Sequence, residues 1–304
     1  MPPLLIIVGP TGSGKTALSL ALAQFFPLEI ISADSRLFYQ GMDIGTAKPT
    51  LTEREAVPHH MIDICHPDET LTVGEYQEKV YGLIDEIHQR EALPVLLGGT
   101  GQYVWAIAEG WGIPRVSPQP RLRQVLEQLG GEELARWLQM LDPSAAATLD
   151  PRNVRRVIRA LEVTLVSGVP MSRHQEKHPP PYKQLILGLR CGRDTLYRRI
   201  DERVDQMMAD GLVDEARRLY KAGYDLHLPA MSGLGYRQLW PYLQGQSTLA
   251  EAVERIKFET HRFVRQQNNW FKPDDPRITW LDIEAGDVVA AAREQITRWN
   301  LGTS

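Results

Sequence analysis

Short runs of apolar residues alternate with amphipathic segments along most of the chain, a pattern typical of a parallel sheet covered by helices. The apolar runs predict strands at 4–8, 28–32, 93–98, 183–189 and 277–281. Apolar residues at helical spacing predict helices at 17–26, at 75–91, from 194 onward, at 248–271 and at 288–299. The sequence therefore predicts an α/β fold with a parallel sheet flanked by helices.

Two proline-rich stretches, at 113–120 and 177–182, interrupt this alternation. Such stretches are typical of semi-rigid connectors. The segment between them carries only helical patterns, at 121–129, 132–141 and 152–166. We therefore predict a core domain made of residues 1–113 and 183–304, with a small all-helical domain of residues 114–182 inserted into it.

A glycine-rich segment, Gly9-Pro-Thr-Gly-Ser-Gly-Lys-Thr16, separates the first predicted strand from the first predicted helix. It fits the spacing of a P-loop, in which glycines let backbone N–H groups close around phosphate and a lysine adds a mobile positive charge. Thr16 is placed to hold Mg²⁺. The sequence therefore predicts a phosphate-bearing ligand bound by Gly9, Pro10, Thr11, Gly12, Ser13, Gly14, Lys15 and Thr16.

Asp34 follows the second predicted strand. If the strands are parallel it lies near the P-loop, because ligands bind at the carboxyl ends of such strands. Three roles remain open for it: a ligand of Mg²⁺, a general base, or a helix cap. The strand at 93–98 ends in Gly98-Gly-Thr-Gly101, where we expect a second close approach of backbone to ligand. A nucleotide hydrolase usually has an acidic residue there, so this ending disfavours a hydrolase.

Two predicted helices carry side chains that suit RNA. The helix at 152–166 has a basic face, formed by Arg152, Arg155, Arg156 and Arg159. Its alternative interpretation is a solvated surface without a ligand. The helix at 248–271 mixes positive charge, amides and aromatic rings, which suit backbone contact and base stacking, although an exposed amphipathic helix has the same pattern. The residue pattern leaves both interpretations open.

Composition narrows the classes of function. The formal net charge of −4 argues against a uniformly basic nucleic-acid binder, so any RNA contact has to come from local patches. Cys65 and Cys191 lack the number and spacing of a disulfide framework or a zinc site. The apolar start at 1–8 is too short for a signal peptide, and no run approaches the length of a membrane span. We expect a cytoplasmic protein, and a monomer because no heptad pattern is present.

Taken together, these motifs resemble the tRNA dimethylallyltransferases, which are the bacterial-type tRNA isopentenyltransferases. The resemblance covers nearly the whole chain and is carried by Gly9–Thr16, Ser32-Ala-Asp-Ser35, Gly41-Met-Asp-Ile-Gly-Thr-Ala-Lys-Pro49, Pro58-His-His-Met-Ile-Asp63, Gly98-Gly-Thr-Gly101, Arg156-Val-Ile-Arg-Ala-Leu-Glu162, Arg199-Ile-Asp-Glu-Arg203 with Met207, and Gly235-Tyr-Arg237. It implies a P-loop core, an inserted helical domain that grips the tRNA anticodon stem-loop, and prenylation of N6 of adenosine-37, on the 3′ side of the anticodon.

The resemblance also implies roles for individual residues. Dimethylallyl diphosphate is the donor and Mg²⁺ on Thr16 the cofactor; Asp34 accepts a proton from the adenine amine. Lys15, Arg193 and Arg203 stabilise the departing diphosphate, and the stacked adenosine has to flip out of the loop to react. The implied tRNA-binding residues are Asp34, Ser35, Arg36, Leu37, Thr100, Arg155, Arg156, Val157, Ile158, Arg159, Ser232, Gly233, Leu234, Gly235, Tyr236, Arg237, Arg265, Gln266, Gln267, Asn268, Asn269, Trp270, Phe271 and Lys272.

Three other functions fit parts of the sequence. A nucleotide-dependent small-molecule kinase needs the same phosphate loop, but would consume ATP and require no RNA. A prenyltransferase acting on a free adenine nucleotide would leave the helical insertion and the basic late helix without a role. A non-catalytic RNA-binding protein would give Asp34 no reason to lie near the phosphate site.

Overall fold

The chain forms two separately packed units. The computed structural model describes residues 1–301. One unit consists of Met1–Val104 together with the chain from Pro181 onward, and the other of Trp105–Pro180. Each unit has a hydrophobic core of its own, and each is described here by itself.

The first unit is built on a six-stranded sheet with the strand order β3-β2-β4-β1-β5-β6. Its strands are β1 (Pro3–Val8), β2 (Leu28–Ser32), β3 (His59–His60), β4 (Leu93–Gly98), β5 (Lys183–Arg190) and β6 (Ile278–Asp282). All five neighbouring pairs are parallel. Because the central strands are buried on both faces, they have the continuous apolar sequences that predicted them. The predicted parallel α/β fold is confirmed.

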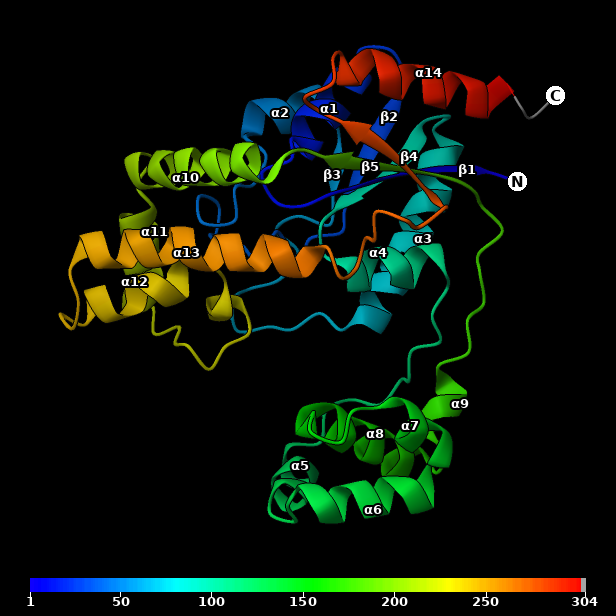
Figure 1. Ribbon diagram of the computed structural model, residues 1–304, viewed down its shortest axis with the longest axis vertical. Helices are drawn as coiled ribbons and strands as arrows, with labels where there is room; N and C mark the ends of the chain where they lie inside the picture. The colour runs from blue at the N-terminus through cyan, green and yellow to red at the C-terminus, as the bar shows by residue number, and fades with distance from the viewer. Residues whose placement is uncertain (302–304) are drawn as a thin grey trace. The chain divides into compact units, whose positions relative to one another are not determined.

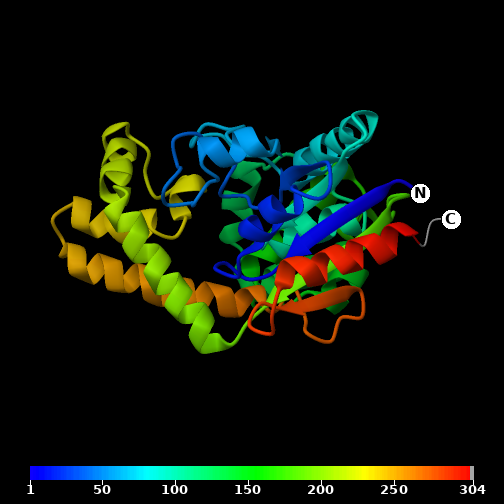
Figure 2. The same cartoon turned by 90° about the horizontal axis from the view of Figure 1, so that it is seen from above.

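Helices surround this sheet and extend beyond one of its ends (Figures 1 and 2). They are α1 (Lys15–Leu22), α2 (Leu51–Ala56), α3 (Val73–Gln89), α4 (Gly101–Ala108), α10 (Arg193–Ala209), α11 (Leu212–Lys221), α12 (Tyr236–Leu243), α13 (Leu249–Gln267) and α14 (Val288–Leu301). Helices α1 and α14 pack with the strands around one apolar cluster, whereas α10 to α13 share a second. None of the helices within residues 1–301 has the length and apolar content that a membrane span needs.

Several elements differ from the sequence prediction. The first helix begins at Lys15 rather than residue 17 and ends at Leu22, and α13 ends at Gln267 rather than residue 271. Helices α2, α4 and α11 and the two-residue strand β3 were not predicted. Helix α2 is only six residues long, and β3 is too short for an alternating pattern to form. Helix α13 begins as predicted, because Thr248 and Glu251 form a capping box.

The second unit begins within α4, at Trp105, and its regular structure consists of helices and one isolated β-bridge between Trp111 and Lys177. Its complete helices are α5 (Pro120–Glu127), α6 (Gly131–Leu141), α7 (Pro143–Thr148), α8 (Val154–Ser167) and α9 (Met171–His174). Their apolar faces meet around Leu134, Leu138 and Leu161. Next to this core lies Glu162, a fully buried carboxylate.

Glu162 is held by two arginines and a backbone N–H group. Arg123 donates to both of its oxygens at 2.8 Å, Arg159 donates at 2.5 Å, and the Gln119 N–H at 2.6 Å. Burial raises the pKa of this carboxyl, but the hydrogen bonds from Arg123, Gln119 and Arg159 outweigh burial and lower the pKa to about 2. Glu162 therefore remains charged and links α5 to α8.

Candidate active site

The P-loop connects β1 to α1 in a conformation that glycine permits. Gly12 and Gly14 have φ angles of 85° and 88°, a left-handed backbone that other residues rarely adopt. The ammonium group of Lys15 donates to the carbonyl oxygens of Gly9 and Pro10, at 2.9 and 3.0 Å. Helix α1 begins at this lysine, so its free N–H groups and positive end face the loop. The loop therefore has the donors of an anion-binding site.

The charge of Lys15 depends on its surroundings. Burial in the loop lowers the pKa of Lys15 to about 8, the Asp34 carboxylate opposes this effect, and the Arg203 guanidinium adds to it. The three side chains thus act on one another electrostatically, although they come from α1, the turn after β2, and α10. The sequence predicted that Asp34 would lie near the P-loop, and this mutual influence agrees with that arrangement.

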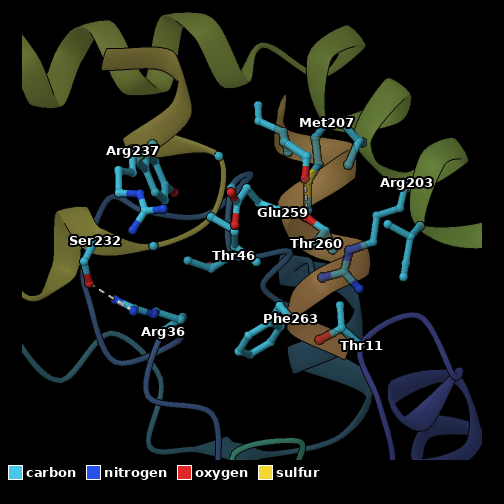
Figure 3. Close-up of a pocket in the computed structure, with 18 of the residues that line it drawn as sticks. Thr11, Arg36, Thr46, Arg203, Met207, Ser232, Arg237, Glu259, Thr260 and Phe263 are labelled. Carbon is cyan, nitrogen blue, oxygen red and sulfur yellow. Dashed lines mark hydrogen bonds between the residues drawn. The ribbon is translucent and has the colours of Figure 1, made fainter. Parts of the chain in front are cut away.

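A cavity of about 510 Å³ lies beside the P-loop in the first unit (Figure 3). Thr11 of the P-loop, Asp34 and Arg36 after β2, and Thr100 before α4 contribute to its lining. Helices α10 and α13 contribute Ile200, Arg203, Val204, Met207, Ile256, Glu259, Thr260, Arg262, Phe263 and Gln266. Ser35, Gly45, Thr46 and residues 232–237 form the rest of the wall. The cavity thus combines cationic and acidic groups with an apolar wall.

Asp34 contributes to both a turn and the cavity. Its Oδ1 accepts the N–H of Arg36 at 3.0 Å, which stabilises the turn after β2. The residue also lines the cavity. Asp34 therefore caps a turn rather than the helix considered from the sequence, and its carboxylate lines the cavity as well.

The two arginines expected at a diphosphate lie in different surroundings. Arg203 is half-buried and lines the cavity. Burial lowers the pKa of its guanidinium, and Asp34 counteracts this. Arg193 is exposed in the first turn of α10, with its guanidinium carbon 5.6 Å from the ring centroid of Tyr197. Arg203 thus belongs to the cavity, and Arg193 lies outside the set of residues that line it.

Two oxygen-bearing side chains of the loop are relevant to a metal. The hydroxyl of Ser13 is buried and has no hydrogen-bond partner among residues 1–301. Thr16 is half-buried in the first turn of α1. Within the same residues, no cluster of three or more His, Cys, Asp or Glu side chains is present. A cation held here would suit Mg²⁺, which binds through one or two protein oxygens together with phosphate oxygens.

Comparisons with known proteins identify the family. Residues 37–274 match the family described as IPP transferase. The tRNA dimethylallyltransferase of Roseiflexus castenholzii is 50% identical over 308 residues, which cover 100% of both chains. The chain belongs to the IPP transferase family. It is therefore an enzyme of prenyl transfer, and this membership argues against the kinase that the phosphate loop left open.

Solved structures support the assignment to the IPP transferase family. The chain is similar to the full-length tRNA isopentenylpyrophosphate transferase of Bacillus halodurans, with a TM-score of 0.72 and 38% identity, covering 99% of this chain and 95% of that one. It is also similar to a eukaryotic dimethylallyltransferase acting on tRNA, with a TM-score of 0.85 and 27% identity, covering 97% and 78% of the two chains. Fold and sequence therefore give the same family.

The residues expected to bind tRNA differ in their exposure. On this family member, the exposed ones are Arg155, Arg156, Ser232, Arg237, Arg265, Gln266, Asn268, Asn269, Trp270 and Lys272. Half-buried ones are Ser35, Arg36, Leu37, Thr100, Arg159 and Leu234. The buried ones are Val157, Ile158, Gly233, Gly235, Tyr236, Gln267 and Phe271. Three of this last set, Gly233, Gly235 and Tyr236, also line the cavity. Contact of these residues with tRNA stays a prediction.

Arg36 and Arg159 both make strong internal contacts. Arg36 donates to the Pro229 carbonyl at 2.7 Å and to the Ser232 hydroxyl at 3.1 Å, the second of which is drawn in Figure 3. It therefore ties the turn after β2 to the segment before α12. Arg159 donates to Glu162 and, at 2.8 Å, to the Val116 carbonyl. The spacing of Arg159 and Glu162 fits a helical ion pair, a signal that the sequence contained.

One buried carboxylate of the first unit was missed altogether. Glu215 of α11 is 1% exposed and accepts the N–H groups of Asp43, Ile44 and Gly45 at 2.8–3.0 Å. It also accepts the hydroxyl of Tyr236 at 2.7 Å. These bonds hold the segment that places Gly45 in the cavity wall. The motif Gly41–Pro49 was recognised in the sequence, but nothing nearby pointed to its partner more than 160 residues away.

Proposed function

We propose that this IPP transferase moves the dimethylallyl group of dimethylallyl diphosphate to N6 of the adenosine on the 3′ side of the tRNA anticodon and releases diphosphate. Transfer of a dimethylallyl group to tRNA is the activity of its family. The observation that carries the finer proposal is the electrostatic coupling of Lys15, Asp34 and Arg203 beside one cavity. That arrangement combines an anion site with a proton acceptor.

The diphosphate would bind to the backbone N–H groups of residues 12–16. Thr11 was included in this set from the sequence, but its N–H already donates to the side chain of Gln267 at 2.9 Å. Lys15 would exchange its two carbonyl partners for phosphate oxygens, a small movement for a flexible side chain. Arg203 would face the same charge from α10. The exposed Arg193 is our second candidate for a diphosphate contact.

The loop suits Mg²⁺ as the metal. Thr16 would hold the ion together with diphosphate oxygens, as expected where the carboxylates of the described residues form no cage. The buried hydroxyl of Ser13, which has no partner within residues 1–301, supports a polar ligand at the loop. When bound, the metal supplies positive charge that stabilises the diphosphate as a leaving group.

Different residues act on the leaving diphosphate and on the adenine amine. The allylic C–O bond breaks and its electron pair stays with diphosphate, where Lys15 and Arg203 stabilise the added charge. The adenine N6 forms the new bond to carbon. Its proton passes to the Asp34 carboxylate, because the amine is a weak nucleophile until that proton leaves. The charged groups are fixed before the reaction, so little reorganisation accompanies the transfer.

We propose two tRNA-contacting surfaces, one on each unit. The helical unit offers Arg155 and Arg156, which are exposed on α8 and make no ion pair within the described residues. The core unit offers Arg237, which lines the cavity and is labelled in Figure 3, and Arg265 near the end of α13. These contacts suit an anticodon stem-loop whose adenosine flips into the cavity. We place the reaction in the cytoplasm and expect the active form to be a monomer.

One experiment tests the proposal against its alternatives. The protein is incubated with Mg²⁺ and dimethylallyl diphosphate labelled in the allyl group, together with bulk tRNA, AMP or buffer. The expected result is label in tRNA alone, on the adenosine 3′ to the anticodon after nuclease digestion. Label in AMP would indicate a free-nucleotide prenyltransferase, and a requirement for ATP would indicate a kinase. Binding of tRNA without transfer of label would indicate a non-catalytic RNA-binding protein.

A further inference from the structure

The side chain of Gln267 joins the P-loop to a second loop of the first unit. Its Oε1 accepts the N–H of Thr11 at 2.9 Å, and its Nε2 donates to the carbonyl oxygen of Gly99 at 3.1 Å. Gln267 is the last residue of α13 and only 6% exposed. One amide therefore satisfies two backbone groups that lie 256 and 168 residues away along the chain.

The glycines after β4 are shaped to receive this end of α13. A Cβ atom at Gly99 would lie 2.5 Å from Nε2 of Gln267 and 3.1 Å from the carbonyl oxygen of Gly9. A Cβ atom at Gly101 would lie 2.4 Å from the side chain of Trp270. The sequence suggested that these glycines let the backbone approach a ligand. The structure shows that Gly99 and Gly101 make room for two side chains of the α13 end, and the approach to a ligand stays a prediction.

The residues held by Gln267 form part of the cavity. Thr11 lines it from the P-loop, and Thr100 lines it from the residue after Gly99. Since both backbone segments are bonded to the same buried amide, their spacing depends on Gln267. The hydrogen bond also takes the Thr11 N–H out of the set that can bind phosphate. Gln267 thus fixes the edge of the phosphate site without facing the cavity itself.

We infer that Gln267 is a positioning residue for prenyl transfer, which holds the P-loop and Thr100 in the geometry that the reaction needs. The inference rests on the proposed function and replaces the expectation that Gln267 binds tRNA. Its neighbours Arg265 and Gln266 are exposed on the side that we propose for tRNA. A displacement of these residues would move Gln267, and through its hydrogen bond to Thr11 it would move the phosphate site. A displacement of about 1 Å in a reacting group reduces the rate on the order of 100-fold.

The first test compares Gln267→Leu with the matched variant Gln246→Leu, which changes an exposed glutamine after α12. For Gln267→Leu we expect kcat to fall roughly 10- to 100-fold, the KM for tRNA to stay within about twofold, and the affinity for inorganic pyrophosphate with Mg²⁺ to fall several-fold. Gln246→Leu should match the wild type in all three. A raised KM for tRNA with unchanged kcat would mean that Gln267 contacts tRNA, and would overturn the inference.

A second variant covers the case in which Gln267→Leu folds poorly. Gly99→Ala places its methyl group 2.5 Å from Nε2 of Gln267, the end of a side chain that can move, and 3.1 Å from the carbonyl oxygen of Gly9, which has to shift by a few tenths of an ångström. It should reproduce the loss of kcat, and the double variant should lose no more than the worse single variant. Independent, multiplying losses would refute a shared mechanism. If the wild type labels no tRNA, the proposed function fails, whereas pyrophosphate affinity still reports on Gln267.

Discussion

Protonation of Lys15 should set how tightly the free enzyme binds diphosphate, and two neighbours should move this dependence in opposite directions. Burial lowers the pKa of Lys15 to about 8, Asp34 opposes the shift, and Arg203 increases it. The variant Asp34→Asn keeps an oxygen to accept the Arg36 N–H but removes the negative charge. It should therefore lower the pKa of Lys15 further. The variant Arg203→Gln should raise it.

The size of the effect follows from the fraction of charged lysine. Below the pKa the ammonium group is fully present, and binding changes little with pH. One unit above a pKa of about 8, close to a tenth of the molecules carry the charge, so affinity should fall about tenfold, or by about 1.4 kcal/mol. The break in the profile should thus lie near pH 8 in the wild type, lower in Asp34→Asn and higher in Arg203→Gln.

Isothermal titration calorimetry with inorganic pyrophosphate and excess Mg²⁺, from pH 6.5 to 9.5, measures these profiles. The ligand titrates in the same way in each experiment, so differences between variants belong to the protein. Lys15→Met provides the baseline, because it carries no titrating amine at this position and its profile therefore contains only the titration of the ligand. A break in Asp34→Asn at the same or a higher pH than in the wild type would refute the coupling, as would a Lys15→Met profile identical in shape to that of the wild type.

Three further predictions address the base, the RNA surface and the helical unit. Asp34→Ala should lower kcat on the order of 10²- to 10⁴-fold with tRNA affinity retained, and a rate within threefold of the wild type would exclude a general base. Replacing both Arg155 and Arg156 by Ala should weaken tRNA binding and reduce the slope of log affinity against log salt by about 2, at unchanged pyrophosphate affinity, as measured by filter binding. Glu162→Gln should lower the free energy of unfolding by about 3 kcal/mol in urea titrations near pH 7, because two arginines lose a buried partner. Since the folded pKa of Glu162 is lowered to about 2, this difference should be present above pH 4.5 and disappear as pH falls towards 2.

Local sequence pattern was sufficient for five of the six strands and for the P-loop. The central strands β1 and β4 are nearly continuous apolar runs, and the phosphate loop is a contiguous motif between a strand and a helix. Elements without such a local signal were missed. Helix α11 has a strongly amphipathic sequence, yet it follows α10 after only Asp210 and Gly211, so the boundary between the two was not recognised. Strand β3 has only two residues, so its pairing with β2 identifies it and its sequence does not.

The arginines show why residue type alone left the RNA surface unresolved. Arg155, Arg156 and Arg159 share one helix and one chemistry, and the sequence assigned them together. In the structure the first two are exposed, whereas the third is held by Glu162 and Val116. Whether an arginine is available to a ligand depends on carboxylates and carbonyls around it, which come here from other segments of the chain as well as from its own helix.

At the end of α13, too, the role of a residue depends on distant parts of the chain. A glycine that makes room for a ligand and a glycine that makes room for a side chain look alike in a sequence, so Gly99 could not be interpreted before Gln267 was seen against it. The exposed Arg265 and Gln266 directly precede the buried Gln267, whose amide holds the P-loop. Substitutions at Arg265 or Gln266 can therefore alter catalysis by shifting Gln267 as well as by losing RNA contacts. Pyrophosphate affinity separates the two causes, because a lost RNA contact leaves it unchanged and a displaced Gln267 does not.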